Sequence, residues 1–153
     1  MNIREATKKD SESIASLIKD LAEKFIVLEF SEEGRNKFLS SNDQSSIEKF
    51  FDSGFIYHVA EKEGEIIGVV GIRDNSHLYH LFISESQQGS GLSRKLWEDA
   101  MRLCLEAGNT GKFTVNSSNN AVGVYEAFGF KRTSGMEESN GVLYNPMCLE
   151  TNS

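Results

Sequence analysis

Apolar positions recur along the chain with two different periods, which predict alternating helices and strands. Between residues 14 and 25 they fall three or four positions apart, the spacing that gives a helix one buried face. Shorter apolar or alternating runs at 55–61, 66–73 and 78–83 are separated by polar turns that carry glycine or asparagine. Three strands joined by such tight turns predict an antiparallel meander in the middle of the chain.

The second half of the chain predicts helices that alternate with strands. Apolar residues return at helical spacing after Gly91, and Gly108 fits the end of that helix. A strand over 112–116 follows, and a strand–helix–strand step of this length favours a parallel pair with a right-handed crossover. Pro146 falls inside the last expected strand, 142–149, where it cannot donate a ladder hydrogen bond, so we expect a bulge or a locally unpaired stretch. The expected fold class is therefore α/β with a central mixed sheet.

Length and composition describe one ordinary globular domain. The chain has 153 residues, of which 39% are hydrophobic and 25% charged, so we expect a single domain over residues 1–153. No run approaches the roughly 20 apolar residues of a membrane span, and the first six residues lack the apolar core of a signal peptide. These features predict a cytoplasmic protein without a membrane partner.

The net charge of -7 argues against nucleic acid as the main partner, because phosphate neutralisation needs a basic surface. An acidic protein weakly favours cationic or amine-bearing substrates, although solubility alone explains the same charge. The two cysteines, Cys104 and Cys148, lie in apolar patterns and are expected to be buried free thiols rather than a disulfide. None of the three histidines pairs with a cysteine at metal-ligand spacing, so no metal is expected.

A glycine-bearing turn over 88–93 is the first candidate site. It stands between the strand at 78–83 and the following helix, and free N–H groups at a helix start suit an anion such as a phosphate. The turn lacks the Gly-Lys-Ser/Thr of a P-loop, and Arg94 occupies the position of the third glycine in the dinucleotide fingerprint. By itself, the turn is at least as consistent with a structural role as with a ligand site.

A second segment, about thirty residues downstream, gives the turn a more specific interpretation. Ala121 to Phe130 reads Ala-Val-Gly-Val-Tyr-Glu-Ala-Phe-Gly-Phe and resembles the Ala-x-x-x-Tyr-x-x-x-Gly-Phe segment of the GCN5-related N-acetyltransferase (GNAT) superfamily. Gln88-Gly89-Ser90-Gly91-Leu92-Ser93 resembles the Gln/Arg-x-x-Gly-x-Gly/Ala acyl-CoA motif of that superfamily, and the element order along nearly the whole chain is similar. Two positions depart from the family pattern, since Ser93 replaces glycine or alanine and Glu85 stands where proline is frequent.

The resemblance implies a fold and an activity. Family members splay the fourth and fifth strands of a mostly antiparallel sheet apart and carry helices on both faces. They use acetyl-CoA as co-substrate, so the implied function is acetyl transfer to a primary amine of a small molecule, peptide or protein by direct attack, without a metal. The amine acceptor is the expected partner, and a homodimer is common in the family. The alternatives are a non-catalytic acyl-CoA-binding sensor or partner-binding module, and an enzyme for a longer acyl donor.

The resemblance also implies a set of binding residues. The extended pantetheine arm of coenzyme A is expected to pair with the strand backbone of Leu81, Phe82 and Ile83. Asn116 or Asn119 is expected to bond the pantetheine amides, or else to serve as a cap or turn residue. Phe30 or Phe38 is expected in the wall of the acceptor site. The pyrophosphate is expected at the helix start, on the backbone of Gln88, Gly89, Ser90, Gly91, Leu92 and Ser93.

Tyr125 and His80 are the expected catalytic residues. Tyr125 matches the tyrosine general acid of the family, and the alternative for it is a packing role. His80 lies on the strand beside the expected pantetheine, and the ordinary pKa of histidine suits a general base. Strand alternation places it on one face with Leu78 and Phe82, which also fits a structural histidine. The other candidates for the base are His77, Glu85, Tyr57 and His58, or an ordered water.

Overall fold

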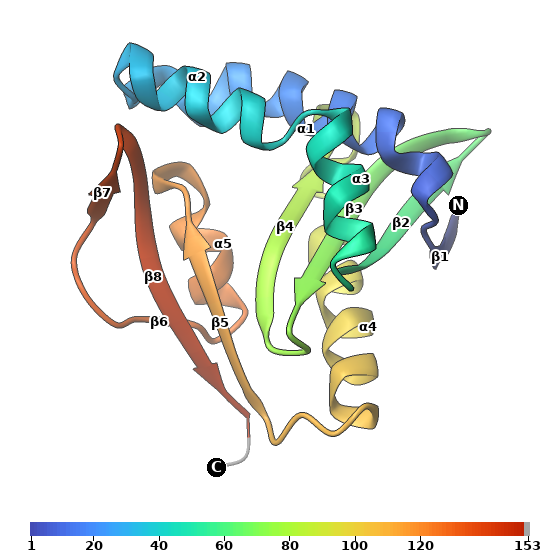
Figure 1. The fold of residues 1–153 in the computed structure, drawn as a ribbon. Coiled ribbons are helices and arrows are strands. Elements are labelled where there is room, and N and C mark those ends of the chain that lie inside the picture. The colour runs from blue at the N-terminus through green and yellow to red at the C-terminus, as the bar shows by residue number, and fades with distance from the viewer. Residues whose placement is uncertain (152–153) are drawn as a thin grey trace.

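Eight strands form a mixed sheet at the centre of the computed structural model, which describes residues 1–151 (Figure 1). Their order is β1-β2-β3-β4-β5-β8-β6, with β7 paired to β8, and within the described residues only β4 and β5 pair in parallel. This order confirms the expected mixed sheet, while residues 152–153 of the expected domain lie outside the described residues. The strands are β1 (Asn2–Glu5), β2 (Ile56–Lys62), β3 (Glu65–Arg73), β4 (His77–Ile83), β5 (Lys112–Ser117), β6 (Lys131–Arg132), β7 (Glu137–Ser139) and β8 (Val142–Glu150).

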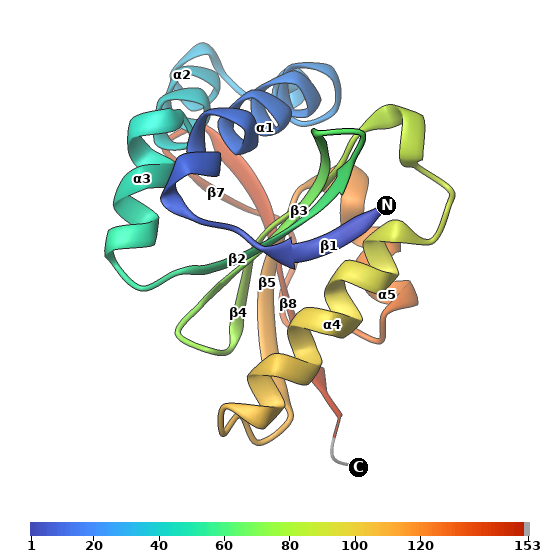
Figure 2. The same cartoon turned by 90° about the vertical axis from the view of Figure 1, so that its right-hand side faces the viewer.

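Helices cover both faces of this sheet, as the resemblance implied (Figure 2). The first three helices lie on one face and the last two on the other. The helices are α1 (Ser11–Phe25), α2 (Glu32–Ser41), α3 (Gln44–Asp52), α4 (Leu92–Glu106) and α5 (Val122–Ala127). Short 3-10 turns are η1 (Lys8–Asp10), η2 (Val27–Glu29), η3 (Glu85–Gln87) and η4 (Asn119–Ala121).

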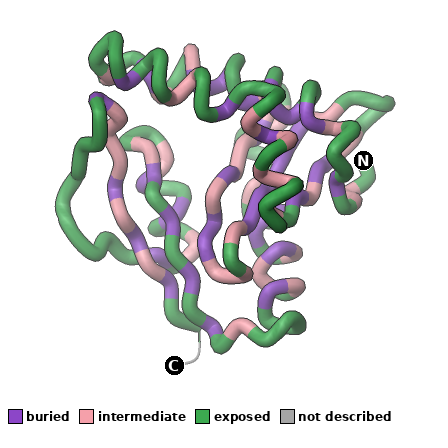
Figure 3. The backbone as a smooth tube through the Cα atoms, in the orientation of Figure 1, coloured by how far each residue is buried: buried purple, intermediate pink, exposed green. Residues whose placement is uncertain are grey.

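An apolar core lies on each face of the sheet, and the buried residues of α1 and α4 belong to these two cores. Figure 3 shows where buried and exposed residues lie along the backbone. Trp97 of α4 is 2% exposed, and its ring packs edge-on against Phe113 of β5 with 5.2 Å between the ring centroids. On the other face, Ile14 and Ile18 of α1 are buried in one cluster with Val69 of β3. Burial on both faces explains why the central strands read as nearly continuous apolar runs.

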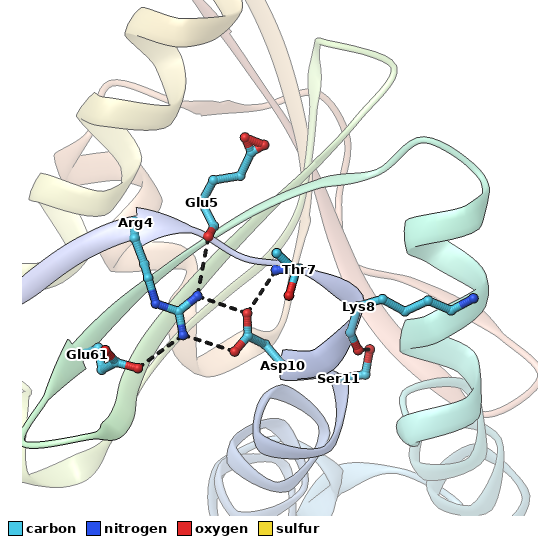
Figure 4. A network of polar contacts seen from close by, with 7 residues as sticks. All are labelled: Arg4, Glu5, Thr7, Lys8, Asp10, Ser11 and Glu61. Atoms are coloured by element: carbon cyan, nitrogen blue, oxygen red, sulfur yellow. Dashed lines mark hydrogen bonds and ion pairs between the residues drawn. The ribbon is translucent and has the colours of Figure 1, made fainter.

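A polar network at the N-terminus fixes the start of α1 (Figure 4). The Arg4 guanidinium donates to both carboxylate oxygens of Asp10, at 2.9 and 3.0 Å, and to Glu61 of β2 at 3.0 Å. The Thr7 N–H donates to the same Asp10 carboxylate at 2.8 Å. These contacts join β1, β2 and the turn before α1, and they hold the pKa of Asp10 below its usual value.

The parallel strands β4 and β5 separate after two paired positions. Within the described register, only His77 and Leu78 of β4 pair with β5, opposite Thr114 and Val115. β8 stays paired with β5 from Lys112 to Ser117, so both strands diverge from β4 together, as Figure 1 shows. The splayed fourth and fifth strands that the resemblance implied are therefore confirmed.

Pro146 lies within β8, and the bulge or unpaired stretch expected around it is present only in part. It pairs with Asn116 in an unshifted β5–β8 register, so the expected bulge is absent on that side. On the other side of β8, β6 reaches Met147 and β7 begins at Tyr144, which leaves Asn145 and Pro146 outside both ladders. The missing proline N–H thus falls outside both of these ladders, although the Pro146 carbonyl still accepts from the Thr133 N–H at 3.0 Å.

A β-bulge in β4 changes which side chains share a face. Ile72 of β3 pairs with Leu78 and its neighbour Gly71 pairs with His80, so Tyr79 is an extra residue in β4. Tyr79 and His80 consequently lie on the same side, with 4.6 Å between their ring centroids. Leu78 instead joins the core under α4. The expected alternation, with Leu78, His80 and Phe82 on one face, is therefore wrong at Leu78.

Candidate functional site

The separation of β4 from β5 opens a cleft of about 780 Å³. Its walls come from both halves of the sheet and from the helices at either side, which is the usual setting of a small-molecule site. Among the expected site residues, Ser90 and Asn119 do not line it. Those that do line it are His80, Leu81, Phe82, Ile83, Gln88, Gly89, Gly91, Leu92, Ser93, Asn116 and Tyr125.

Two glycines shape the turn at one end of the cleft. Gly91, the N-cap of α4, has φ +85°, and Gly89 has φ +79°, a conformation that side chains with a Cβ rarely adopt. A Cβ added at either glycine would meet no atom within 4 Å, so the space beside both is open. The turn therefore leaves its backbone accessible to a ligand.

Some backbone N–H groups of this turn donate hydrogen bonds within the protein, and others have no acceptor. Gln88 and Ser90 donate within the turn, to the carbonyls of Glu85 and Gln87. The Gln88 side chain also donates to the Ile83 carbonyl at 3.1 Å, which fixes the turn against the end of β4. The N–H groups without an acceptor among the described residues are those of Gly89, Gly91, Leu92, Ser93 and Arg94. Free N–H donors at a helix start suit an anion.

The adjoining strand edges offer further free groups. The β4 backbone from Leu81 to Ile83 has no β5 partner in the described register, so an extended amide chain can pair with it. The exposed Asn116 side chain, near the end of β5, forms no hydrogen bond with another described residue. The Asn119 side chain is already engaged, because it donates to Glu29 at 2.7 Å and accepts from Asn145 at 2.8 Å.

Tyr125 reaches the cleft from α5. Its side chain is 6% exposed and packs edge-on against Phe130, yet its hydroxyl has no hydrogen-bond partner among the described residues. Burial raises the pKa of Tyr125, so the phenol stays protonated at neutral pH. Arg94 of α4 holds α5 in place, since it donates to the Ala127 carbonyl at 3.1 Å and lies over the Phe128 ring.

His80 is buried and fully hydrogen-bonded. Its Nε2–H donates to the Asn42 side-chain oxygen at 2.6 Å, and its Nδ1 accepts from the Tyr57 hydroxyl at 2.9 Å. The Asn42 amide group in turn donates to the Phe38 carbonyl at 2.8 Å, which identifies its oxygen as the acceptor. Burial lowers the pKa of His80 to about 3, so it is neutral at pH 7 and has no free nitrogen for a further proton.

The other candidates for the base are no better placed. His77 lines the cleft, but its Nδ1 lies 2.7 Å from the Thr114 hydroxyl and burial lowers its pKa to about 4. Tyr57, Glu85 and His58 do not line the cleft. Tyr57 donates to His80, Glu85 is ion-paired with Lys24, and His58 lies near the charges of α4.

Helix α2 contributes Lys37, Phe38 and Ser41 to the wall of the cleft and lies on the opposite face of the sheet from α4 (Figure 2). Near its start, Gly34 contacts Gly141 so closely that an added Cβ would lie 2.1 Å from the Gly141 oxygen. At its end, Asn42 binds His80 of β4. The helix thus spans from β8 to β4, and Phe30 and Phe38 both line the cleft, as expected for at least one of them.

The sequence did not indicate several cleft residues. Lys37 and Ser41 share the inner face of α2 with Phe38, and this mixture of side chains gives no apolar pattern. Leu143 and Tyr144 of β8 enter the cleft only because β8 follows β5 away from β4. The sequence did contain one indication of a shared face, because Gly34, Lys37, Phe38 and Ser41 have the i, i+3, i+4, i+7 spacing of residues on one side of a helix.

Other features of the chain lie outside the cleft. Cys104 and Cys148 are free, as expected, with Cys104 buried and Cys148 half-buried. Residues 1–151 contain no group of three or more His, Cys, Asp or Glu side chains that is arranged to hold a metal ion. No described helix is both long and apolar enough to cross a membrane.

Known proteins resemble this chain in sequence and in fold. Human N-acetyltransferase 8B is 28% identical over 105 residues, which are 60% of this chain and 46% of that protein. The chain thus spans about half the length of this curated relative. A GCN5-related N-acetyltransferase from Rhodopseudomonas palustris superposes with a TM-score of 0.78 at 18% identity, covering 98% of this chain and 95% of that one. The PaiA N-acetyltransferase of Thermoplasma acidophilum, in complex with coenzyme A, gives 0.73 at 16% identity and covers 98% of both chains.

The family assignment rests on a match to most of the chain. Residues 26–151 match the model of the acetyltransferase (GNAT) domain. The match includes both sequence segments that carried the resemblance. The chain belongs to the GNAT family of acetyltransferases.

Proposed function

We propose that this chain transfers an acetyl group from acetyl-CoA to a primary amine by direct attack of the amine. When bound, acetyl-CoA supplies an activated acetyl group and a thiolate leaving group. The observation that carries the proposal is the Tyr125 hydroxyl, which has no partner among the described residues and opens on the same cleft as the free N–H groups of the α4 start. A buried acid and an anion site in one cleft are what this transfer requires.

The binding roles follow from which groups are free. The N–H groups of Gly89, Gly91, Leu92 and Ser93 would hold the pyrophosphate, because they are donors without acceptors at a positive helix end. The open β4 edge at 81–83 would pair with the pantetheine amides, and Asn116 would reach them from β5. Gln88 and Ser90 would shape the turn through their internal bonds. The contacts of Asn119 do not favour its expected role in binding, which stays a prediction.

Tyr125 would act as the general acid. Its raised pKa keeps the hydroxyl protonated at neutral pH, so it would be able to donate to the thiolate sulfur, whose basicity burial raises in the same way. Water in the cleft would return a proton to the phenolate. A positioned general acid contributes about 10²- to 10⁴-fold to a rate. Arg94 would support this role indirectly, since it ties α5 to the same helix whose start forms the anion site.

The proton of the attacking amine would leave through water in the cleft. The role of His80 as base stays a prediction that its contacts do not favour, because both ring nitrogens are engaged and burial holds its pKa near 3. His77 has the same limitation, with a pKa of about 4. We propose that His80 instead positions α2 through Asn42.

Thiol release from acetyl-CoA, measured against a panel of primary amines, tests the proposal. Amine-dependent release, with an acetylated amine identified by mass spectrometry, is the expected result. Coenzyme A binding is measured separately by calorimetry. Binding without turnover of any amine would contradict the transfer proposal and favour the non-catalytic module. Longer acyl-CoA donors in the same assay show whether acetyl is the preferred group.

A further inference from the structure

The cleft of this acidic protein contains no acidic side chain among its described lining residues. Three glutamates close in sequence to cleft residues have other partners: Glu29 accepts from Asn119, Glu85 pairs with Lys24, and Glu137 accepts from Tyr144. A polycationic acceptor such as a polyamine would therefore lose hydration on its distal ammonium groups without gaining a carboxylate partner. That loss is costly, so the cleft disfavours acceptors with several positive charges.

Lys37 is the single lysine or arginine among the described cleft residues. It is an exposed residue of α2 that lines the cleft beside Phe38, and it forms no ion pair with another described residue. A lysine ammonium in a partly apolar cleft gains most from a carboxylate or another anion, through a charge-assisted hydrogen bond. The protein carries a net charge of -7, so an anionic ligand needs such a local cation to overcome the general repulsion.

The cleft that Lys37 lines also has apolar and aromatic side chains in its walls. Phe30 and Phe38 meet edge-to-face, with 6.0 Å between their ring centroids, and Leu143 and Tyr144 approach from β8. Aromatic walls of this kind suit a flat or branched apolar group. An apolar wall with one unpaired cation is complementary to an amphipathic molecule with one negative charge.

We infer that the acceptor is a small apolar or aromatic amine that also carries a carboxylate, and that Lys37 binds that carboxylate. The inference rests on the proposed amine acetyltransfer and names its substrate class. The acceptor amine faces the Tyr125 side of the cleft, its apolar body lies between α2 and β8, and its carboxylate meets Lys37. Lys37 is thus a specificity residue, and it takes no part in proton transfer.

Matched pairs of acceptors test this inference. Phenylalanine, leucine and aminohexanoate are each compared with the amine that lacks the carboxylate, namely phenethylamine, isoamylamine and pentylamine, and spermidine serves as the polycation. The wild-type protein is expected to favour at least one acid over its partner amine by tenfold or more in kcat/KM. Lys37→Ala should reduce that preference about tenfold and leave kcat/KM for the simple amine within about twofold, and Lys37→Glu should reverse the preference.

The control is Lys62→Ala, which removes an exposed lysine at the end of β2, outside the cleft, and should leave the preference unchanged. The inference is overturned if wild type uses both members of every pair equally, if Lys37→Ala lowers both members alike, or if spermidine is the best acceptor. Turnover in any of these patterns leaves the proposed transfer intact. Absence of turnover with every amine, despite coenzyme A binding, overturns the proposed transfer and this inference together.

Discussion

The Tyr57 hydroxyl donates to His80 Nδ1 at 2.9 Å, and this bond fixes the tautomer of a buried, neutral histidine. The opposite nitrogen donates to Asn42 at the end of α2. Three elements, β2, β4 and α2, therefore meet at one imidazole, and the helix that contributes to the wall of the cleft is held by it. The arrangement links the position of the acceptor wall to the protonation state of His80.

Protonation of His80 should destabilise the fold between pH 7 and pH 5. The pKa of His80 is about 3 in the folded protein and ordinarily 6.5, so below pH 6.5 the unfolded chain binds the extra proton and stability falls as the pH falls. The expected loss from His80 is about 2 kcal/mol of unfolding free energy at pH 5. Urea unfolding at pH 7, 6 and 5 measures it.

His80→Gln is the matched variant for this prediction. Glutamine retains a donor and an acceptor but does not titrate, so the pH dependence of its unfolding free energy should be smaller than that of the wild type by about 2 kcal/mol. The dependence that remains is assigned to His77, whose pKa is about 4, and to His58, whose pKa burial also lowers. Equal slopes for the variant and the wild type would show that His80 is not buried as a neutral group.

Gly91→Ala should weaken acetyl-CoA binding. Gly91 has φ +85° at the start of α4, and alanine in this conformation costs about 1 kcal/mol and shifts the neighbouring N–H donors. We expect the KM for acetyl-CoA to rise about tenfold. Gly108→Ala imposes the same kind of strain at the other end of α4, where φ is +104° and no ligand is proposed.

The two glycine variants separate strain from ligand binding. Both should lose a similar amount of stability in thermal unfolding, while only Gly91→Ala should raise the KM for acetyl-CoA. A similar KM for both variants would mean that the α4 start does not hold the pyrophosphate.

Gly34→Ala should displace α2 from β8. The new Cβ would lie 2.1 Å from the Gly141 oxygen, so the helix has to move, at a cost of about 1–3 kcal/mol. The KM for the amine should rise while the KM for acetyl-CoA changes little. Gly123→Ala is the same change in α5, where a Cβ would meet nothing within 4 Å, and it should be neutral or slightly stabilising. An unaltered amine KM in Gly34→Ala would contradict the role of α2 as the acceptor wall.

The order of the elements and the side of the cleft proposed to bind acetyl-CoA could be predicted, because both depend on local sequence signals. The glycine turn, the stripe of α4 and the Ala121–Phe130 segment each specify their structure within a few residues. The meander of 55–83 follows in the same way from short alternating runs and turn residues.

The side of the cleft proposed to bind the amine could not be predicted, because it depends on contacts between segments that are distant in the sequence. The bulge at Tyr79 reverses the faces of β4 without any glycine or proline in β4 itself to mark it. The burial of His80 depends on Tyr57 and Asn42, which lie 23 and 38 residues away. Lys37 becomes a cleft residue only through the contact of α2 with Gly141.

The most direct test of the proposed chemistry is the steady-state and single-turnover kinetics of Tyr125→Phe. This change removes one hydroxyl that has no partner among the described residues, so folding and acetyl-CoA binding should be preserved. With a good amine acceptor, kcat should fall at least a hundredfold, while the Kd for acetyl-CoA stays within about threefold. A single-turnover rate equal to that of the wild type would contradict the assignment of Tyr125 as the general acid.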